Sequence, residues 1–251
     1  MKYKSLKLTH VDGKMHHLGI TENDIAQNVI IPQTPEDVVS VAKLFDFAEN
    51  KGQWREYLTY TGKVQNTPIS VMSSGMGCMP MAITVEELKH VGAKNLIKIG
   101  TGAAIQPGIK PGTLFISSSA VRSEGATLEY INYRYPGIAN IDAINALVSA
   151  AEDFGEKPIV GMFRSHDAVY LEDDPESVEF WKELKVDFVE GETSALLTIA
   201  ALLRGLKAAS ICVAIANYTE GTEIEEEELK ERLEICSKIA IKALQILNEG
   251  K

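Results

Sequence analysis

Several features are scarce in this sequence, and each absence excludes a class of protein. The three cysteines, Cys78, Cys212 and Cys236, are far apart and form no CxxC pair, which favours reduced thiols in a cytoplasmic protein. No apolar run approaches the roughly 20 residues that a membrane span needs, and the N-terminus lacks the apolar core of a signal peptide. The five histidines show no metal-ligand spacing, so we expect no metal site.

Positive charge is also scarce. Lysine and arginine number 25 against 35 aspartates and glutamates, a net charge of −10, which argues against nucleic acid or an anionic membrane as partner. A small anionic ligand is still compatible, because it needs only a local basic pocket. With 251 residues, 45% of them hydrophobic, and no linker or repeat, the chain is expected to form a single domain over 1–251. Residues 1–14 are expected to be an irregular N-terminal extension.

What the sequence does contain is a set of β-branched apolar runs that alternate with helical patterns. Residues 28–45 read as a strand, a proline-bracketed turn and an amphipathic helix. The further predicted strands cover 67–75, 95–103, 112–121, 158–165, 186–192 and 209–217, and the further predicted helices cover 79–92, 141–155, 193–205 and 223–250. This alternation predicts an α/β fold with a mixed, twisted central sheet flanked by helices.

Three motifs follow predicted strands and can carry chemistry. Gly75 and Gly77 let a backbone approach a ligand at a helix start, although a tight turn explains them equally. The segment 98–102, KIGTG, offers amides, a hydroxyl and an ammonium, but its composition is common in loops. Glu190 and Glu192 lie two apart on a strand, so both carboxylates can converge on a vicinal diol. The alternative for these acids is an N-cap glutamate beside a solvated one.

The order of these motifs resembles one enzyme family. The blocks SSGMGCMPMAITVEELKHVGAKNLIKIGTGAAIQP, AVRSEGAT and VEGETSALLTIAALL are similar to the nucleoside phosphorylase and nucleosidase family, and most to its uridine phosphorylase branch. The similarity runs from about residue 17 to the C-terminal helix. It implies a sheet partly closed into a barrel and cleavage of a nucleoside N-glycosidic bond through a ribosyl cation-like transition state. No organic cofactor is implied, because charge stabilisation alone breaks this bond.

The resemblance also implies roles for individual residues at the sugar. Glu192 would hold the ribose hydroxyls with Glu190 close by, and Thr101 would touch the sugar and the nucleophile. Gly191 stands where phosphorylases keep a methionine that packs on the sugar. His17 would reach the ribose 5′ end from a neighbouring subunit.

A second set of residues is implied at the nucleophile. Arg55 would cross the same subunit interface toward the phosphate, and Lys98 and Gly102 would lie beside it. The resemblance therefore implies a homo-oligomer, at least a dimer and commonly a hexamer of dimers, with active sites at the subunit interface.

The first loop departs from the family pattern. Phosphorylases carry a PGDPxR loop whose glycine and arginine hold phosphate, whereas this chain has PQTPED, with Gln33 for the glycine and Asp37 for the arginine. A second phosphate arginine has become Lys98, which keeps the charge but loses the bidentate fork. These changes weaken phosphate binding. In nucleosidases of the family a glutamate in this loop activates water, and Asp37 fits that role unless it is a surface acid in the first helical turn or Glu36 takes its place.

The expected reaction follows from this loop. We place hydrolysis modestly ahead of phosphorolysis with inorganic phosphate, which would give ribose 1-phosphate. A non-catalytic nucleoside-binding protein is a third reading, because several base-contacting residues have also changed.

The leaving-group end departs as well. Asn217 occupies the place where purine-cleaving relatives have an aspartate that protonates the base, and an amide cannot supply a proton. Tyr218 follows where the uridine branch has an arginine, and Val169 replaces an aromatic that stacks on the base. The base is therefore not identified by the sequence.

One additional pair lies on the predicted strand 158–165 and just beyond it. Arg164 can anchor an acidic or carbonyl-rich leaving group, or it can form a salt bridge to the acids at 172–174. His166 can titrate near neutrality, although a lone histidine beside a turn is more often structural.

Overall fold

A ring of five paired strands forms the centre of the computed structural model, which describes residues 5–171, 174–203 and 205–249. Around the ring, β5 pairs with β10, β10 with β6, β6 with β8, β8 with β9, and β9 with β5. The ring strands are β5 (Asn95–Ala104), β6 (Leu114–Ser123), β8 (Ile159–His166), β9 (Phe188–Glu190) and β10 (Lys207–Asn217). Because each strand has two partners, the ring is a small closed barrel.

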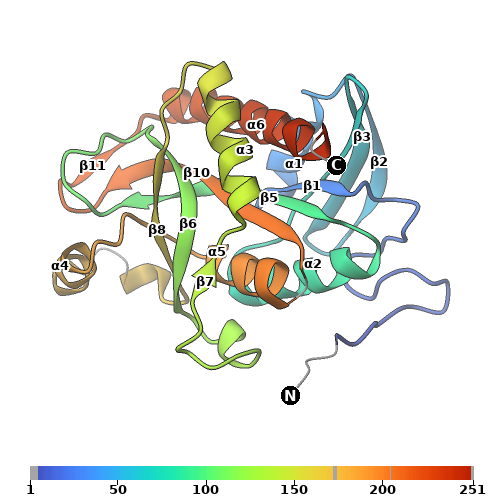
Figure 1. Cartoon of the computed structure of the whole chain (residues 1–251), viewed down its shortest axis with the longest axis horizontal. Coiled ribbons are helices and arrows are strands. Elements are labelled where there is room, and N and C mark those ends of the chain that lie inside the picture. The colour runs from blue at the N-terminus through green and yellow to red at the C-terminus, as the bar shows by residue number, and fades with distance from the viewer. Residues whose placement is uncertain (1–4, 172–173, 204, 250–251) are drawn as a thin grey trace.

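The same sheet continues from the barrel as a twisted arm (Figure 1). β1 pairs in parallel with β5 and with β4, and β3 and β2 follow in antiparallel order. The remaining strands are β1 (Asn28–Ile31), β2 (Phe47–Trp54), β3 (Tyr57–Val64), β4 (Thr67–Met72), β7 (Gly137–Ile138), which pairs with β6, and β11 (Thr222–Glu223), which pairs with β10. The predicted mixed, twisted and partly barrel-like α/β fold is therefore confirmed.

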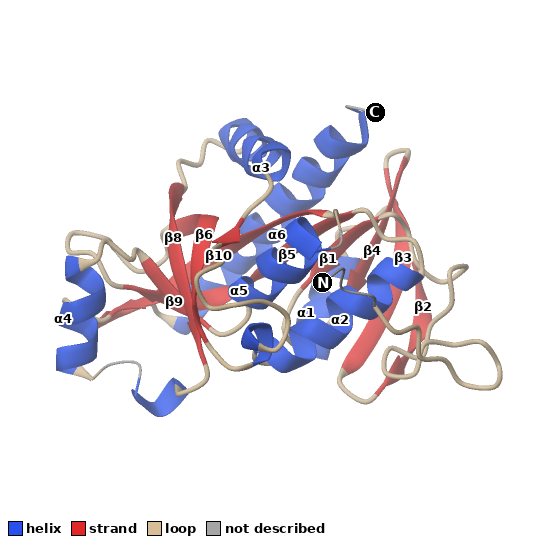
Figure 2. Ribbon diagram, turned by 60° about the horizontal axis from the view of Figure 1, so that its bottom comes forward, coloured by secondary structure: helices blue, strands red, loops and turns tan. Residues whose placement is uncertain are grey.

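Helices cover both faces of this sheet. In Figure 1, α3 and α6 lie along the upper side and α2 and α5 along the lower side, and Figure 2 shows α4 beyond the barrel at the end opposite to β2. The helices are α1 (Pro35–Ala42), α2 (Cys78–His90), α3 (Ile141–Asp153), α4 (Pro175–Glu183), α5 (Thr193–Leu196) and α6 (Glu226–Glu249), with short 3-10 turns at Ala126–Leu128 and Val169–Leu171. None of the helices in the described ranges is both long and apolar enough to cross a membrane.

The structure differs from the sequence patterns in three places. The hairpin of β2 and β3 was not predicted, because β2 is largely solvent-exposed and shows no clear alternation of apolar residues. Helix α4 was not predicted either. The helix expected over 193–205 is α-helical only over Thr193–Leu196, and Leu197–Leu203 widens into a π-helical turn. Residues 5–14 form turns and one isolated bridge between Thr9 and Met15.

An aromatic cluster fills the barrel. The ring of Phe188 lies 4.8 Å from that of Phe115 and 4.7 Å from that of Phe163, and all three side chains are fully buried. The barrel is therefore a packed core, and ligands must bind at its end. Gly102 lies in the wall, where a Cβ atom would come within 2.2 Å of the Val189 carbonyl oxygen. This contact explains the glycine by the close approach of β5 and β9.

Candidate active site

A buried ammonium joins the two predicted sugar-site carboxylates. Lys98 lies on β5 with no solvent exposure, and its Nζ is 2.8 Å from Glu190 Oε2 and 3.1 Å from Glu192 Oε2. Strand β5 runs parallel to β10 and antiparallel to β9, which brings residues that are distant in sequence to one end of the barrel. The sequence-predicted residues Lys98, Glu190 and Glu192 thus meet, but they pair with one another.

Glu190 is saturated by donors from the protein. Its Oε1 accepts from the hydroxyl of Ser165 at 2.5 Å, and the backbone amides of Glu192 and Thr193 donate to the same carboxylate at 2.9–3.1 Å. Burial alone would raise the pKa of Glu190, but the Lys98 ammonium and these hydrogen bonds outweigh it and hold the pKa below its ordinary value. Glu190 therefore anchors the start of α5 and the Lys98 ammonium.

The charge of Lys98 is set by the same contacts. Complete burial disfavours the ammonium, but the carboxylates of Glu190 and Glu192 outweigh that penalty, so the pKa of Lys98 lies well above its ordinary value. Burial likewise raises the pKa of the Cys212 thiol to about 12, which leaves it neutral at pH 7. The cluster carries one positive and two negative charges.

Glu192 differs from Glu190 because one of its oxygens still lacks a hydrogen bond. Oε1 accepts from the side-chain amide of Gln33 and from the backbone amide of Gly77, both at 2.8 Å. Oε2 is buried and accepts no hydrogen bond among the described residues, although it makes the ion-pair contact with Lys98. Buried acceptors are nearly always satisfied, so Oε2 is the oxygen of this carboxylate that has capacity for a further donor.

Gly191 lies between the two glutamates. The closest atoms to a Cβ built on Gly191 belong to Gly77 and lie 3.8 Å away, so the loop before α2 packs directly against this turn. Oε1 of Glu192 faces the Gly77 amide of this loop, and Oε2 faces the Lys98 ammonium.

The first loop places Asp37 at the start of helix α1. Thr34 is the N-cap: its hydroxyl accepts from the Asp37 amide at 3.2 Å and donates to Asp37 Oδ2 at 2.8 Å. The Thr34 hydroxyl thus satisfies one amide at the helix start, and an acid in this turn suits the helix dipole. The alternative that Asp37 is a first-turn acid thus describes its local bonding, and Glu36 lies beside it in the same turn.

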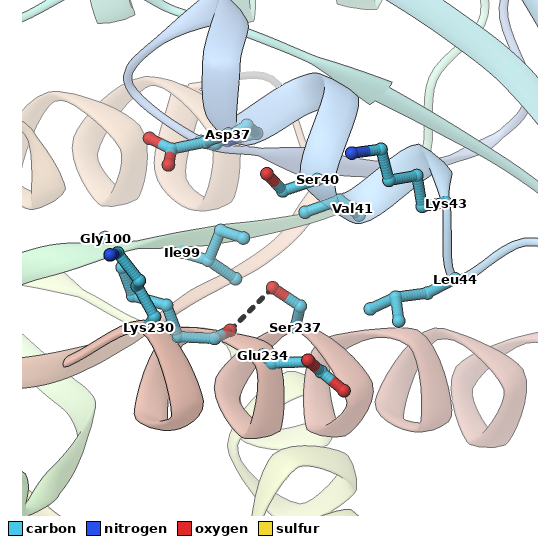
Figure 3. Close-up of a pocket in the computed structure, with 12 residues that line it drawn as sticks. Asp37, Ser40, Val41, Lys43, Leu44, Ile99, Gly100, Lys230, Glu234 and Ser237 are labelled. Atoms are coloured by element: carbon cyan, nitrogen blue, oxygen red, sulfur yellow. Dashed lines mark hydrogen bonds between the residues drawn. The ribbon is translucent and has the colours of Figure 1, made fainter. Parts of the chain in front are cut away.

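A cavity of about 400 Å³ opens next to this turn (Figure 3). Asp37, Ser40 and Lys43 reach it from α1, Lys230, Glu234 and Ser237 reach it from α6, and Ile99 and Gly100 of β5 lie behind them. Both acidic and basic side chains line the cavity. A Cβ on Gly100 would lie 3.3 Å from Lys98 Nζ and 3.9 Å from Gln33 Oε1, so this glycine separates the cavity from the buried cluster. Thr101 is the next residue of β5 and is half-buried.

The two residues expected to act across a subunit interface lie elsewhere on this chain. Arg55 occupies the exposed turn between β2 and β3 with a left-handed φ of 58°. His17 is held by Glu87: its Nδ1 lies 2.6 Å from Glu87 Oε1, and the amides of His17 and Leu18 donate to the same carboxylate. No described contact brings Arg55 or His17 to the Lys98 cluster of the same chain.

The structure does not gather the predicted base-contacting residues. Asn217 is fully buried and caps the turn after β10, because its amide donates to the carbonyls of Gln106 and Ile109 and its Oδ1 accepts from the amide of Thr219. These bonds give Asn217 a structural role in this turn. Val169 is 60% exposed in a short 3-10 turn.

Arg164 also points away from the cluster. Consecutive strand residues face opposite sides, so Ser165 faces Glu190 while Arg164 faces α4. There its guanidinium lies 4.6 Å above the ring of Trp181, and its Nε donates to Ser123. Arg164 thus packs against α4, and residues 172–173 of the alternative salt bridge lie outside the described ranges.

His166 and Tyr218 complete the predicted set. His166 is buried at the end of β8, and Tyr218 is partly buried near Trp181 on the outer side of the barrel. Neither side chain has a described contact with Glu192.

Sequence reasoning missed several residues that hold the site. Ser165 and Glu87 bind predicted site residues directly, but each contact depends on strand register or on a loop that meets a distant segment. The described residues contain no group of three or more histidines, cysteines or acids placed to hold a metal.

Comparisons with known proteins agree with this geometry. A sequence profile of the phosphorylase superfamily matches residues 27–249. The chain is 35% identical to uridine phosphorylase of Thermococcus kodakarensis over 82% of this chain and 78% of that one, and 32% identical to guanosine phosphorylase of Halorubrum lacusprofundi over 93% and 99%. The crystal structure of uridine phosphorylase from Vibrio fischeri superposes with a TM-score of 0.86 at 33% identity, covering 94% of this chain and 97% of that one.

Proposed function

The chain belongs to the phosphorylase superfamily, and from that premise we propose that it is an enzyme that cleaves a nucleoside by phosphorolysis, giving a free base and ribose 1-phosphate. The observation that carries this choice of nucleophile is the similarity to uridine and guanosine phosphorylases over nearly the whole chain. The bonding of Asp37 in the cap of α1 supports it, because this carboxylate has a structural partner already. The sequence alone favoured hydrolysis, and the similarity to phosphorylases favours phosphorolysis instead.

The proposed mechanism uses the open edge of Glu192. A sugar hydroxyl donates to Glu192 Oε2, and the anionic cluster beneath the sugar stabilises positive charge as the bond from C1′ to the base nitrogen breaks. A phosphate oxygen attacks C1′, the bonding electron pair leaves with the base, and the base takes a proton from water. A neighbouring subunit's copy of Arg55 supplies positive charge to the phosphate, while Lys98 holds Glu190 and Glu192 in place.

Hydrolysis is a second candidate, favoured by the charge of the cluster. Lys98 is shared between two carboxylates, so the cluster is negative overall, and Asp37 adds another acid at the neighbouring turn. A neutral water molecule suffers no repulsion from these acids, whereas phosphate does.

Product analysis tests the choice. Purified enzyme is incubated with uridine, guanosine and their 2′-deoxy forms, with and without inorganic phosphate, and sugar products are separated. Phosphorolysis predicts turnover that requires phosphate and yields a sugar 1-phosphate. Free sugar formed at the same rate without phosphate would replace phosphorolysis by hydrolysis, and no product from any nucleoside would overturn both.

An Asp37→Asn variant sharpens this test. Under phosphorolysis, turnover continues and the KM for phosphate falls several-fold, because a repelling charge of about 1 kcal/mol or more is removed near the anion. Under hydrolysis, cleavage is lost, because the base that activates water is gone. Glu36→Asn on the same helical turn is the matched control and leaves both parameters unchanged.

A further inference from the structure

Gln33 occupies an acceptor of the carboxylate that would bind the sugar. A carboxylate can only accept hydrogen bonds, so the side-chain nitrogen of Gln33 must be the atom that faces Glu192 Oε1 at 2.8 Å. The Gly77 amide donates to the same oxygen at 2.8 Å. Both acceptor directions of Oε1 are therefore used, and only Oε2 is open.

The backbone around Gln33 is fixed, so this contact is built into the site. The Gly75 amide donates to the Gln33 carbonyl and the Ser74 amide donates to the Pro32 carbonyl, each at 2.9 Å. These bonds tie the first loop to the loop before α2, which also supplies the Gly77 amide. The two loops that donate to Glu192 Oε1 are therefore hydrogen-bonded to each other.

The side-chain oxygen of Gln33 lies on the Gly100 side, where a Cβ built on Gly100 would be 3.9 Å from it and 3.3 Å from Lys98 Nζ. Of the Glu192 carboxylate, Oε2 is therefore the oxygen left to accept from a sugar hydroxyl.

A vicinal diol has two donor hydroxyls, whereas the Glu192 carboxylate leaves one oxygen to accept from them. Its two hydroxyls normally donate to the two oxygens of one carboxylate. With Oε1 of Glu192 taken, a ribose that donates through one hydroxyl keeps the other without an acceptor in a buried site. A 2′-deoxyribose brings a single hydroxyl to this edge and has no such cost.

We propose that Gln33 is a specificity-determining residue that makes 2′-deoxyribonucleosides the preferred substrates over ribonucleosides. This inference rests on the proposed function, because it takes Glu192 as the sugar-hydroxyl acceptor. It does not depend on whether phosphate or water attacks, since the nucleophile is the same for both sugars.

Paired substrates test the proposal. The ratio of kcat/KM for 2′-deoxyuridine over uridine, and for 2′-deoxyguanosine over guanosine, is measured by release of the free base. We expect the unmodified enzyme to favour the deoxy form by at least about fivefold, because an unmet buried hydroxyl costs that much or more. In Gln33→Gly and Gln33→Ala the ratio falls toward one, through a lower KM for the riboside.

The controls separate this inference from the proposed function. Gln65→Gly makes the same chemical change in the exposed turn between β3 and β4, where φ is 54°, and leaves the ratio unchanged. Cleavage of both sugars at equal efficiency by the unmodified enzyme overturns the role of Gln33 but keeps the enzyme a nucleoside-cleaving one. A ratio that stays high in both Gln33 variants overturns it as well. Failure to cleave any nucleoside overturns the proposed function itself.

Discussion

At the scale of single residues, the buried ammonium of Lys98 decides how charge is held in the site. It contacts both Glu190 and Glu192 with no exposure to solvent. A buried ion pair of this kind adds little net stability against an apolar substitute, but removal of one partner leaves charges without compensation. The cluster therefore depends strongly on its single cation.

The Lys98→Met variant tests this dependence. We expect a loss of about 3–5 kcal/mol in the free energy of unfolding at pH 7, because two buried carboxylates lose their cation. Lys242→Met is the control, since Lys242 and Asp153 form an exposed pair at 3.6 Å, and it should cost less than about 1 kcal/mol. Denaturant titration measures both.

The pH dependence of this loss has a definite sign. The pKa of Glu190 is lowered, so its contribution is present above the ordinary value of about 4.3 and is lost as pH falls through the folded-state value. The pKa of Lys98 is raised, so its contribution is present below about 10.4 and is lost as pH rises through the folded-state value. The gap between Lys98→Met and the unmodified protein should therefore shrink as pH falls below about 4.3 toward the folded-state pKa of Glu190, and a constant gap would contradict the ion-pair account.

At the scale of elements, one arginine holds the long segment that follows β6. The guanidinium of Arg122 donates to the carbonyls of Thr127, Ile131, Asn132 and Tyr135 and to the hydroxyl of Thr127, at 2.6–2.8 Å. Glu124 accepts from the Thr127 amide and from the Ser194 hydroxyl, which ties the same segment to the start of α5. The segment after β6 is thus fixed to the wall of the site.

The Arg122→Lys variant should loosen that segment. Lysine keeps the charge but lacks the planar fork, so two or more charged hydrogen bonds are lost. We expect amide hydrogen exchange over 126–135 to speed up on the order of 100-fold while exchange in α3 and α6 stays the same. Arg134→Lys is the control, because Arg134 is exposed in the same segment. Equal effects of the two variants would show that Arg122 is not what holds it.

At the scale of the whole molecule, no described contact brings Arg55 to the Lys98 cluster of its own chain. Arg55 lies on an exposed hairpin turn, and the side chain of Trp54 beside it is 49% exposed. An exposed aromatic side chain next to an arginine is typical of a surface that a second copy covers. We therefore keep the prediction that Arg55 and His17 act across a subunit interface.

Mixing of inactive variants tests this arrangement. Arg55→Ala and Glu192→Gln are each expected to be inactive, but random mixing of their subunits should restore about a quarter of full activity, because half of the dimers carry one complete site. Mixing Arg55→Ala with His17→Ala is the control and restores nothing, since both residues would come from the same donor subunit. Equal activity in the two mixtures would contradict sharing of sites.

Much of the fold was determined by local patterns in the sequence. The apolar spacing of α2, α3 and α6 and the β-branched runs of β1, β5 and β10 predicted these elements near their observed bounds, because such periodicity needs no distant partner. The order of the glycine and acid motifs also determined the family. The hairpin of β2 and β3 could not be predicted in this way, because its exposed strand has no apolar face.

Only the tertiary structure decided how the site residues are used. Lys98 and Glu190 are 92 positions apart and meet through strand register, and Gln33 reaches Glu192 across 159 positions. Arg164 and Ser165 are neighbours, yet register and alternation send one to α4 and the other to Glu190. A sequence names the charges available to a site, but hydrogen-bond partners depend on ångström-scale distances that only packing sets.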